Sequence, residues 1–463
     1  MDRPEAAAPE RPALHPAIIE RVRMSHPIRD GNATADQDAW RCPVTGVTLN
    51  WPMSRRAESH HAPDSRSRTG GIPRHRPFAG PALLQAGFRP FFLGAALWSA
   101  LALCLWFGIV VGHVTLPTAF DPLTWHAHEM IFGFAAAAVA GFMLTAIPNW
   151  TGRLPLQGGP LALLVLLWLG GRIAVATSAA IGAVPAAAID LSFLLLLLLA
   201  VLREIVAGRN WRNLPMPAAL GLLTTANLLV HLEAIGAART ATLGLRLALA
   251  MLLMLIALIG GRLIPSFTRN WLVKRDPGRV PTGFGAVDRF ALIACAAGLA
   301  GWVAEIEATV TGVMLIVAGT LAALRLARWR GYLTAREPLL WILHLGHAWL
   351  AFGLMLLGLG QIWAAVPATA GLHALTAGAI GTMVLAVATR ATLGHTGRPL
   401  AAGHGTTAIY LLVTTAAALR VAAALTATLQ LPLLAASAVA WIAAFLLFVA
   451  LYATPLLTPR LQS

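Results

Sequence analysis

The sequence predicts an all-α, polytopic membrane protein with twelve transmembrane helices, and three observations support this fold class. Of the 463 residues, 58% are hydrophobic and only 11% are charged. The mean hydropathy is +0.72. Average soluble domains carry about 25% charged residues, so this chain has too little polar surface to cover a water-soluble globule. From residue 91 onward, apolar runs alternate with short polar breaks, as in a chain that crosses a lipid bilayer repeatedly.

Three segments follow from this pattern. Residues 1–85 are rich in Pro, Arg, Ala, Asp and Ser and show no helical period, which predicts a disordered, basic, cytoplasmic tail. Residues 86–455 are predicted to form the transmembrane domain, and residues 456–463 a short cytoplasmic C-terminus. No signal peptide precedes the first apolar run, so we expect the first spanning helix to drive membrane insertion.

The polar breaks divide the transmembrane domain into twelve runs of about 20 residues, each long enough to cross a hydrocarbon layer of about 30 Å. Gly and Pro mark most of the ends. The predicted spans begin near Phe91, Thr124, Gly159, Pro185, Met216, Ala241, Gly285, Ala308, Pro338, Gly371, Thr406 and Leu433.

Basic residues alternate between the two sides of this topology. The tail and the connections after the even-numbered spans carry most of the loop arginines and lysines, whereas the connections after the odd-numbered spans offer only Arg239. The positive-inside rule therefore predicts that both termini are cytoplasmic. These loops also account for the net charge of +15, so we expect no nucleic-acid partner.

Similar segments end spans two, six and ten: "IPNWTGR" (147–153), "IPSFTRNW" (264–271) and "LGHTGR" (393–398). One interpretation is that Thr, Gly and Arg are common at cytoplasmic helix ends. The other is that the chain contains three pseudo-repeated four-helix units.

The topology places several ionisable side chains and one amide inside the membrane, where ionisable groups are rare and commonly mark functional sites. Most lie near the predicted outer face, and two histidines of span nine lie about a third of the way in from the other side. The set is His126, His128, Glu129, Asn227, His231, Glu233, His344, His347 and His373. Each histidine alone could simply bond to a helix-end carbonyl.

The spacing of these histidines limits what they can share. His344 and His347 lie three residues apart on one helical face, so both can face one centre. His126 and His128 project about 200° apart on a helix and cannot ligate the same centre unless the helix start unwinds. Imidazoles without thiolates suit haem iron, copper or zinc, and the three cysteines form no cluster.

Small residues and arginines near these histidines permit two interpretations each. Glycines on spans two and ten could admit a flat macrocycle or could serve helix packing. The glycines are Gly133, Gly141, Gly371, Gly378 and Gly381. Arginines within the spans could pair with haem propionates or with a buried acid such as Asp190.

Several motifs together resemble the NnrS family across roughly residues 86–455. They are "GFRPFF" (87–92), "WHAHEMIFGF" (125–134), "GFMLTAIPNWTG" (141–152), "GRLIPSFT" (261–268), "HALTAGAIGTM" (373–383) and "LGHTGR" (393–398). That family is described as twelve-span proteins of the bacterial inner membrane that contain haem and copper and are linked to denitrification and nitric oxide resistance. The resemblance implies these attributes here and makes His126, His128, His373 and His395 the motif histidines.

The layout is also similar to the catalytic subunit of haem–copper oxidases and nitric oxide reductases. By that analogy His126 or His128 would pair with His373 across one haem. A second metal centre, for example a copper centre, would be held by His231, His344 and His347. Arg262 and Arg390 are the arginines assigned to this cofactor. Span six here has no histidine, although that superfamily places copper ligands there.

Three functions remain open from the sequence. The first is a haem and copper protein that binds or turns over nitric oxide, with Glu129 and Glu233 relaying protons and an unidentified electron donor. The second is a twelve-span transporter with a polar His/Glu pathway. The third is delivery of metal to a respiratory enzyme.

Overall fold

The computed structural model describes residues 40–41, 48–49 and 78–461. In the first part, β1 (Trp40–Arg41) and β2 (Thr48–Leu49) pair antiparallel. The predicted disordered tail falls largely outside the described residues and stays a prediction. Its described end, from residue 78, contains one short 3-10 turn, η2 (Ala82–Leu84).

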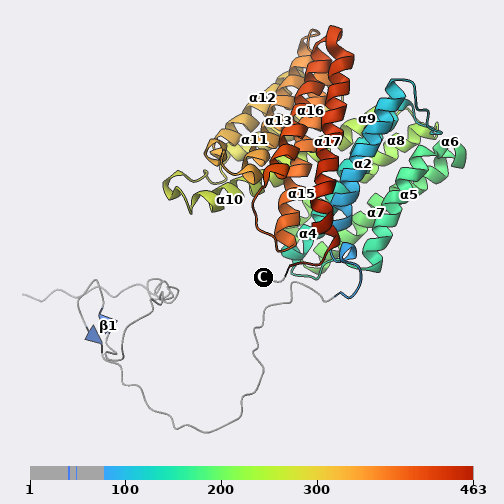
Figure 1. Ribbon diagram of the computed structural model, residues 1–463. Coiled ribbons are helices and arrows are strands. Elements are labelled where there is room, and N and C mark those ends of the chain that lie inside the picture. The colour runs from blue at the N-terminus through green and yellow to red at the C-terminus, as the bar shows by residue number, and fades with distance from the viewer. Residues whose placement is uncertain (1–39, 42–47, 50–77, 462–463) are drawn as a thin grey trace, which may run out of the picture. The chain divides into compact units, whose positions relative to one another are not determined.

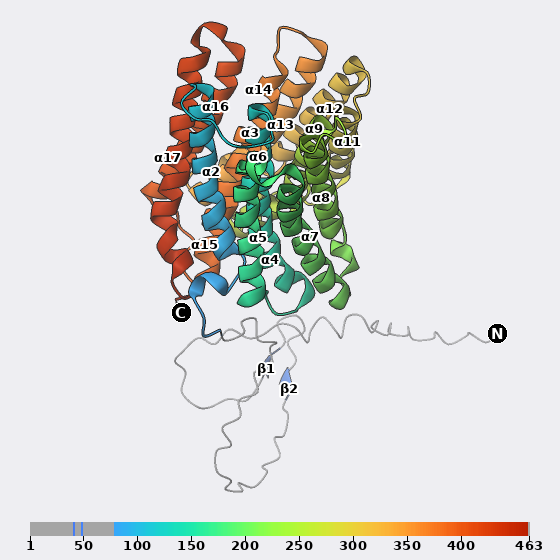
Figure 2. The ribbon, with the colours of Figure 1, turned by 90° about the vertical axis from the view of Figure 1, so that its right-hand side faces the viewer.

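The transmembrane unit confirms the all-α polytopic fold, with twelve helical spans long and apolar enough to cross a membrane among the described residues. Its helices run largely side by side (Figure 2). The elements up to span six are α2 (Phe88–Val110), α3 (Pro122–His128), η3 (Glu129–Ala135), α4 (Ala136–Thr151), α5 (Gly159–Ala176), α6 (Ser178–Ile181), α7 (Ala183–Ala207), η4 (Trp211–Asn213), α8 (Pro215–Ala234), α9 (Ala241–Leu255), η5 (Ile256–Gly260) and α10 (Gly261–Leu272). The remaining elements are η6 (Pro277–Arg279), α11 (Ala286–Val303), α12 (Ala308–Ala327), η7 (Gly331–Thr334), α13 (Pro338–Ile362), α14 (Ala368–His373), η8 (Ala374–Gly381), α15 (Thr382–His395), α16 (His404–Leu425), η9 (Ala427–Leu429) and α17 (Gln430–Leu457).

Local chemistry sets the start of span two, which carries the first motif histidines. Asp121 Oδ1 accepts hydrogen bonds from the backbone N–H groups of Leu123 and Thr124 at 3.1 and 3.0 Å. Pro122 follows as the first helical residue, where its missing N–H costs nothing and its fixed φ suits a helix. This cap fixes where the helix begins, and therefore the directions in which the His126 and His128 side chains project.

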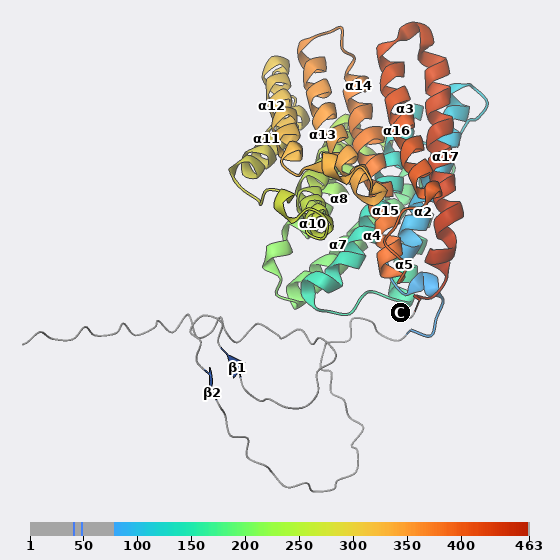
Figure 3. The same ribbon diagram turned by 60° about the vertical axis from the view of Figure 1, so that its left-hand side comes forward.

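The spans divide into inner and peripheral helices. Spans two, six, nine and ten have more than half of their apolar windows buried. The first and last spans, α2 and α17, pack against each other, and Figure 1 shows them side by side. The end of span six departs from this arrangement, because α10 runs across the direction of the neighbouring helices (Figures 1 and 3). The inner spans are the ones that carry most of the predicted site residues.

Three of the inner spans contain a π-helical segment: η3 in span two, η5 in span six and η8 in span ten. A π-turn inserts an extra residue into an α-helix and is frequent at functional sites. Two carbonyls of these segments accept side-chain hydrogen bonds: Trp168 Nε1 donates to Gly133 O at 2.9 Å, and Arg325 Nη1 to Ala257 O at 2.8 Å. The same three spans carry the similar sequence segments, but the four-helix repeat stays a prediction.

The five glycines singled out on spans two and ten lie against neighbouring side chains. A Cβ at Gly141 would lie 2.8 Å from the Phe92 ring, and one at Gly378 2.6 Å from the Trp349 ring. Gly133, Gly371 and Gly381 are crowded in the same way by Trp98, Leu357 and Trp441. The structure therefore favours close helix packing at these glycines over space for a macrocycle.

Candidate metal sites in the membrane

A network of buried polar side chains joins spans two to five at the end of the bundle where α3 begins, which is the predicted outer end. Each member is at most 1% exposed. The members are His128 of α3, Glu129 of η3, Arg172 of α5, Asp190 of α7, and Asn227 and His231 of α8. We call this set the Asp190 network.

Asp190 lies at the centre of the network. Its Oδ1 accepts from Arg172 Nη2, and its Oδ2 accepts from Asn227 Nδ2 at 2.8 Å and from His231 Nε2 at 3.0 Å. Gly171 makes room for this carboxylate, because a Cβ there would lie 2.5 Å from Asp190 Oδ1. A buried carboxylate needs such partners, since burying it without opposite charge or donors costs several kcal/mol.

The neighbours of His128 determine its protonation. Arg172 Nη1 donates to Glu129 Oε2 at 2.7 Å. His128 Nδ1 lies 3.0 Å from Glu129 Oε1, and its Nε2 lies 2.9 Å from Asn227 Oδ1. Asn227 already donates its amide hydrogen to Asp190, so its oxygen faces His128. Both ring nitrogens of His128 therefore face acceptor oxygens, an arrangement that suits an imidazolium.

This assignment balances the charge of the network. Arg172 and His128 supply two positive charges, and Glu129 and Asp190 supply two negative charges at ion-pair distance. Charged side chains are tolerated inside a membrane-spanning bundle when positive and negative groups pair with one another. The network is thus balanced in charge without any added ion.

Three members of the network could nevertheless hold a metal ion. His128, Asp190 and His231 each offer a ligand atom, and these atoms lie within 4.8 Å of one another. No other group of three or more His, Cys, Asp or Glu side chains converges in this way among the described residues. His231 Nδ1 is buried and has no hydrogen-bond partner in that part of the chain. Imidazole nitrogens and a carboxylate suit copper or zinc.

A second arrangement lies near the start of α3 and α14, on the other face of span two. The His126 ring stacks on the Trp106 ring of α2 with centroids 4.5 Å apart. His126 also interacts electrostatically with His373 of α14 and with Arg420 of α16. Within residues 78–461, no group bonds to His126 Nδ1, which is buried. His126 and His128 therefore serve different surroundings, as their spacing predicts.

The orientation of His373 leaves one ring nitrogen ready to bind a ligand. His373 Nδ1 lies 2.7 Å from the carbonyl oxygen of Thr369. A carbonyl only accepts, so Nδ1 carries the hydrogen and Nε2 carries the lone pair. Metal-binding histidines commonly donate their other N–H to a backbone carbonyl in this way.

A third arrangement contains the two histidines of α13. His344 Nε2 lies 2.9 Å from Thr268 Oγ1 of α10, and the Trp329 ring lies 4.6 Å from the His347 ring, centroid to centroid. Three buried ring nitrogens have no hydrogen-bond partner among the residues described: His344 Nδ1 and both nitrogens of His347. His231 is instead part of the Asp190 network, so the predicted centre of His231, His344 and His347 is not assembled here.

The other predicted site residues lie apart from these arrangements. Glu233 is exposed, and its Oε2 accepts a hydrogen bond from Ala241 N at 2.8 Å, at the start of α9. Arg262 is exposed. The Arg390 guanidinium lies 4.1 Å from the Phe267 ring centroid, and it follows His373 by almost five helical turns, about 25 Å. Neither arginine is among the charged groups that act on His373, whereas Arg420 interacts electrostatically with it.

Asp190, Arg172 and Arg420 are the site residues that sequence reasoning left unassigned. The sequence did contain a signal for them. Arg172 and Asp190 lie in two adjacent apolar spans, and each buried charge needs an opposite charge inside the membrane. The sequence did not show that Arg172 contacts both Asp190 and Glu129, since that depends on how spans two, three and four pack. The last motif histidine, His395, contacts the Phe88 ring at 5.5 Å between centroids.

Comparison with known proteins identifies the family. The family model described as NnrS protein matches residues 82–460, which is most of the chain. Comparison with curated proteins gives no match. The match spans all twelve membrane helices and every residue of the three arrangements described above. The chain belongs to the NnrS family.

Proposed function

We propose that this protein is an integral membrane haem and copper protein of the nitric oxide response, which binds or turns over nitric oxide at a histidine-ligated metal site. The observation that carries the proposal is the hydrogen bond from His373 Nδ1 to Thr369 O, which leaves Nε2 as a ligand atom on a ring that interacts electrostatically with His126. Membership of the NnrS family supports the choice of cofactors and ligand.

The side chains around His373 offer the kinds of group that ligate a haem and pair with its propionates, although the glycines of the same span are packed too closely to admit the ring there. His126 and His373 come from two different spans and would hold the iron from their ring nitrogens. Arg420 interacts electrostatically with both histidines and would pair with an anionic propionate. Haem iron supplies affinity for small diatomic ligands and one-electron chemistry when bound.

The Asp190 network fits a cuprous ion. The ligand atoms of His128, Asp190 and His231 converge, and His128 carries a proton between acceptors. A cuprous ion has the same charge as the proton it would replace on His128, so the two positive and two negative charges of the network stay balanced. Arg172 keeps its bonds to Glu129 and Asp190 in either state.

Glu129 is the group we propose for moving protons. Its Oε1 lies 3.0 Å from His128 Nδ1, a distance that allows direct transfer between the two side chains. Glu233 is exposed and bonds to the start of α9, which supports a capping role for it rather than a catalytic one. We further propose a location in the bacterial inner membrane with both termini cytoplasmic, and reduction by a separate electron donor.

Absorption spectra and metal analysis of the purified protein test these assignments. We expect a reduced-minus-oxidised haem spectrum, with iron and copper bound per chain. His373→Ala should abolish the haem band and keep copper, whereas His231→Ala should lose copper and keep the haem band. His113→Ala, in an exposed loop, is the matched control.

Other outcomes would overturn the proposal in distinct ways. A colourless, metal-free protein would favour the transporter, and copper without haem would favour metal delivery. A haem band that survives both His126→Ala and His373→Ala would remove these two histidines from the haem site.

A further inference from the structure

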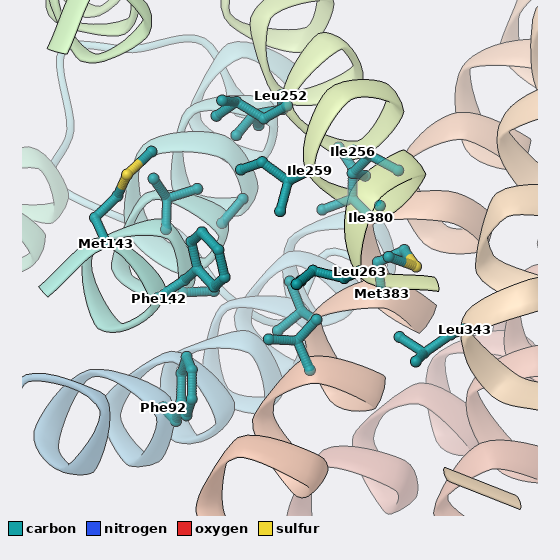
Figure 4. A pocket seen from close by; sticks show the side chains of 17 residues that line it. Phe92, Phe142, Met143, Leu252, Ile256, Ile259, Leu263, Leu343, Ile380 and Met383 are labelled. Atoms are coloured by element: carbon teal, nitrogen blue, oxygen red, sulfur yellow. The ribbon is translucent and has the colours of Figure 1, made fainter. Parts of the chain in front are cut away.

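An apolar pocket of about 100 Å³, only partly enclosed, lies between the inner spans and span one. Its walls come from spans one, two, six, nine and ten, and Figure 4 shows their side chains around a common space. Every lining residue that the structure describes is apolar or glycine. Phe92, Met143, Leu252, Leu343 and Met383 represent the five spans. We call this space the central chamber.

The central chamber lies where the three π-helical segments meet. Ala135 ends the segment of span two, Ile256 to Gly260 form that of span six, and Ile380 lies in that of span ten. All three segments contribute to the chamber wall. A π-turn widens a helix and displaces side chains from a regular α-helical register. All three irregular segments therefore border the same space.

The chamber is chemically suited to one class of ligand. Apolar cavities of roughly 150 Å³ stay dry and bind benzene or xenon, because water finds no hydrogen-bond partners in them. The uncharged walls offer no partner to a charged substrate, and the volume of about 100 Å³ suits a very small apolar molecule. We propose that the central chamber binds an uncharged molecule of two or three heavy atoms, such as a dissolved gas.

Gly260 places the chamber next to an imidazole. A Cβ at Gly260 would lie 3.6 Å from Met383 Cε and 3.8 Å from His347 Nδ1, which is ordinary contact. Neither ring nitrogen of His347 has a hydrogen-bond partner among the residues of the described unit. Gly260 therefore separates His347, which is not itself part of the wall, from a ligand in the chamber. Nitric oxide would be one such ligand, and only that identification rests on the proposed function.

Xenon is the probe, because it binds apolar cavities without metal chemistry. We propose a xenon titration of the full-length protein in detergent, with ¹³C-methyl methionine labels read by NMR. The Met143 and Met383 methyl signals should shift and saturate, since both residues line the chamber. Met355 contacts Gly319 and serves as the internal reference. Equal, non-saturating shifts at all three methionines would overturn the proposal.

A filled chamber provides the second test. Gly260→Leu adds methyl groups inside the chamber and should abolish the saturable shifts, and Gly260→Ala should weaken them. Gly221→Leu makes the same change in α8, where a Cβ would meet only Leu198 at 3.9 Å, and should leave xenon binding intact. Saturable shifts that persist in Gly260→Leu would place xenon elsewhere and refute the proposal. Loss of haem or copper in the wild-type protein would not change these results, so the two proposals fail separately.

Discussion

The Asp190 network and the pair His344–His347 are both buried in the bundle, yet they satisfy their polar atoms in opposite ways. In the network, each charged group meets an opposite charge or a hydrogen-bond acceptor. In the pair, three of the four ring nitrogens lack a partner among the described residues. The charges of one region are therefore balanced without a ligand, whereas most ring nitrogens of the other region have no partner among the described residues.

This difference separates two criteria that are often used together to recognise a metal site. Convergence of ligand atoms favours the network, where three groups lie within 4.8 Å of one another. Free lone pairs favour the pair, because an unpartnered buried polar group costs about 1–3 kcal/mol. A metal would enter the network by replacing a proton, and would enter the pair without displacing one. The following predictions distinguish these two kinds of site.

The largest effect is expected from removing the central carboxylate of the network. Asp190→Ala leaves Arg172 and His128 with one negative charge between them, and breaking a buried ion pair costs about 3–5 kcal/mol. We expect a large fall in the melting temperature of the protein in detergent. Glu233→Ala removes an exposed carboxylate and is the control. Equal melting temperatures for the two variants would show that the network does not stabilise the fold.

Coupling between Arg172 and Asp190 should be the next largest effect. Arg172→Met and Asp190→Leu each leave the network with one uncompensated buried charge, whereas the double variant removes both partners of an ion pair. We expect the double variant to be more stable than the sum of the single losses by about 0.5–3 kcal/mol. Thermal denaturation of the four proteins gives this coupling. Additive losses would mean that the two residues act separately.

The transmembrane fold could be predicted from sequence because its signals are local. Gly159, Ala241, Ala308 and Pro338 begin helices at the residues where the apolar pattern placed span starts. The polarity of each run, about 20 residues long, decides whether it can cross a bilayer, and no tertiary contact is needed. The starts of α2 and α14 lie three residues earlier than predicted, which is within the fraying of helix ends.

The candidate sites were predicted less completely because they depend on packing between spans. Histidine spacing showed that His126 and His128 face different surroundings, since that follows from helix geometry alone. The placement of His231 beside Asp190, away from His347, depends on which spans are neighbours. The choice of Arg420 over Arg390 beside His373 has the same origin. The π-turns also shift the register after His128 and His373, and no sequence period reveals them.

A smaller effect is expected from removing the hydrogen bond of His344 Nε2, the one ring nitrogen of the His344–His347 pair that has a partner among the described residues. Thr268→Val removes the hydroxyl bonded to His344 Nε2 and leaves that ring without a hydrogen bond among the described residues. The expected loss is about 1 kcal/mol, the usual net value of a neutral hydrogen bond. Thr320→Val is the control, because Thr320 is exposed and bonds within its own helix. A Thr268→Val loss comparable to that of Asp190→Ala would show that His344 belongs to a charged network as well.

The smallest effect is expected from His347→Phe. Phenylalanine keeps a ring of similar shape against Trp329 and removes two unpartnered nitrogens, so the free energy of unfolding should change by less than about 1 kcal/mol or should increase. His128→Phe makes the same change inside the network, where both ring nitrogens are bonded, and should be clearly destabilising. Melting temperature and copper content should be measured on the same samples. If His347→Phe loses copper and His128→Phe keeps it, free lone pairs rather than convergent ligands mark the copper site, and our assignment of copper to the Asp190 network is wrong.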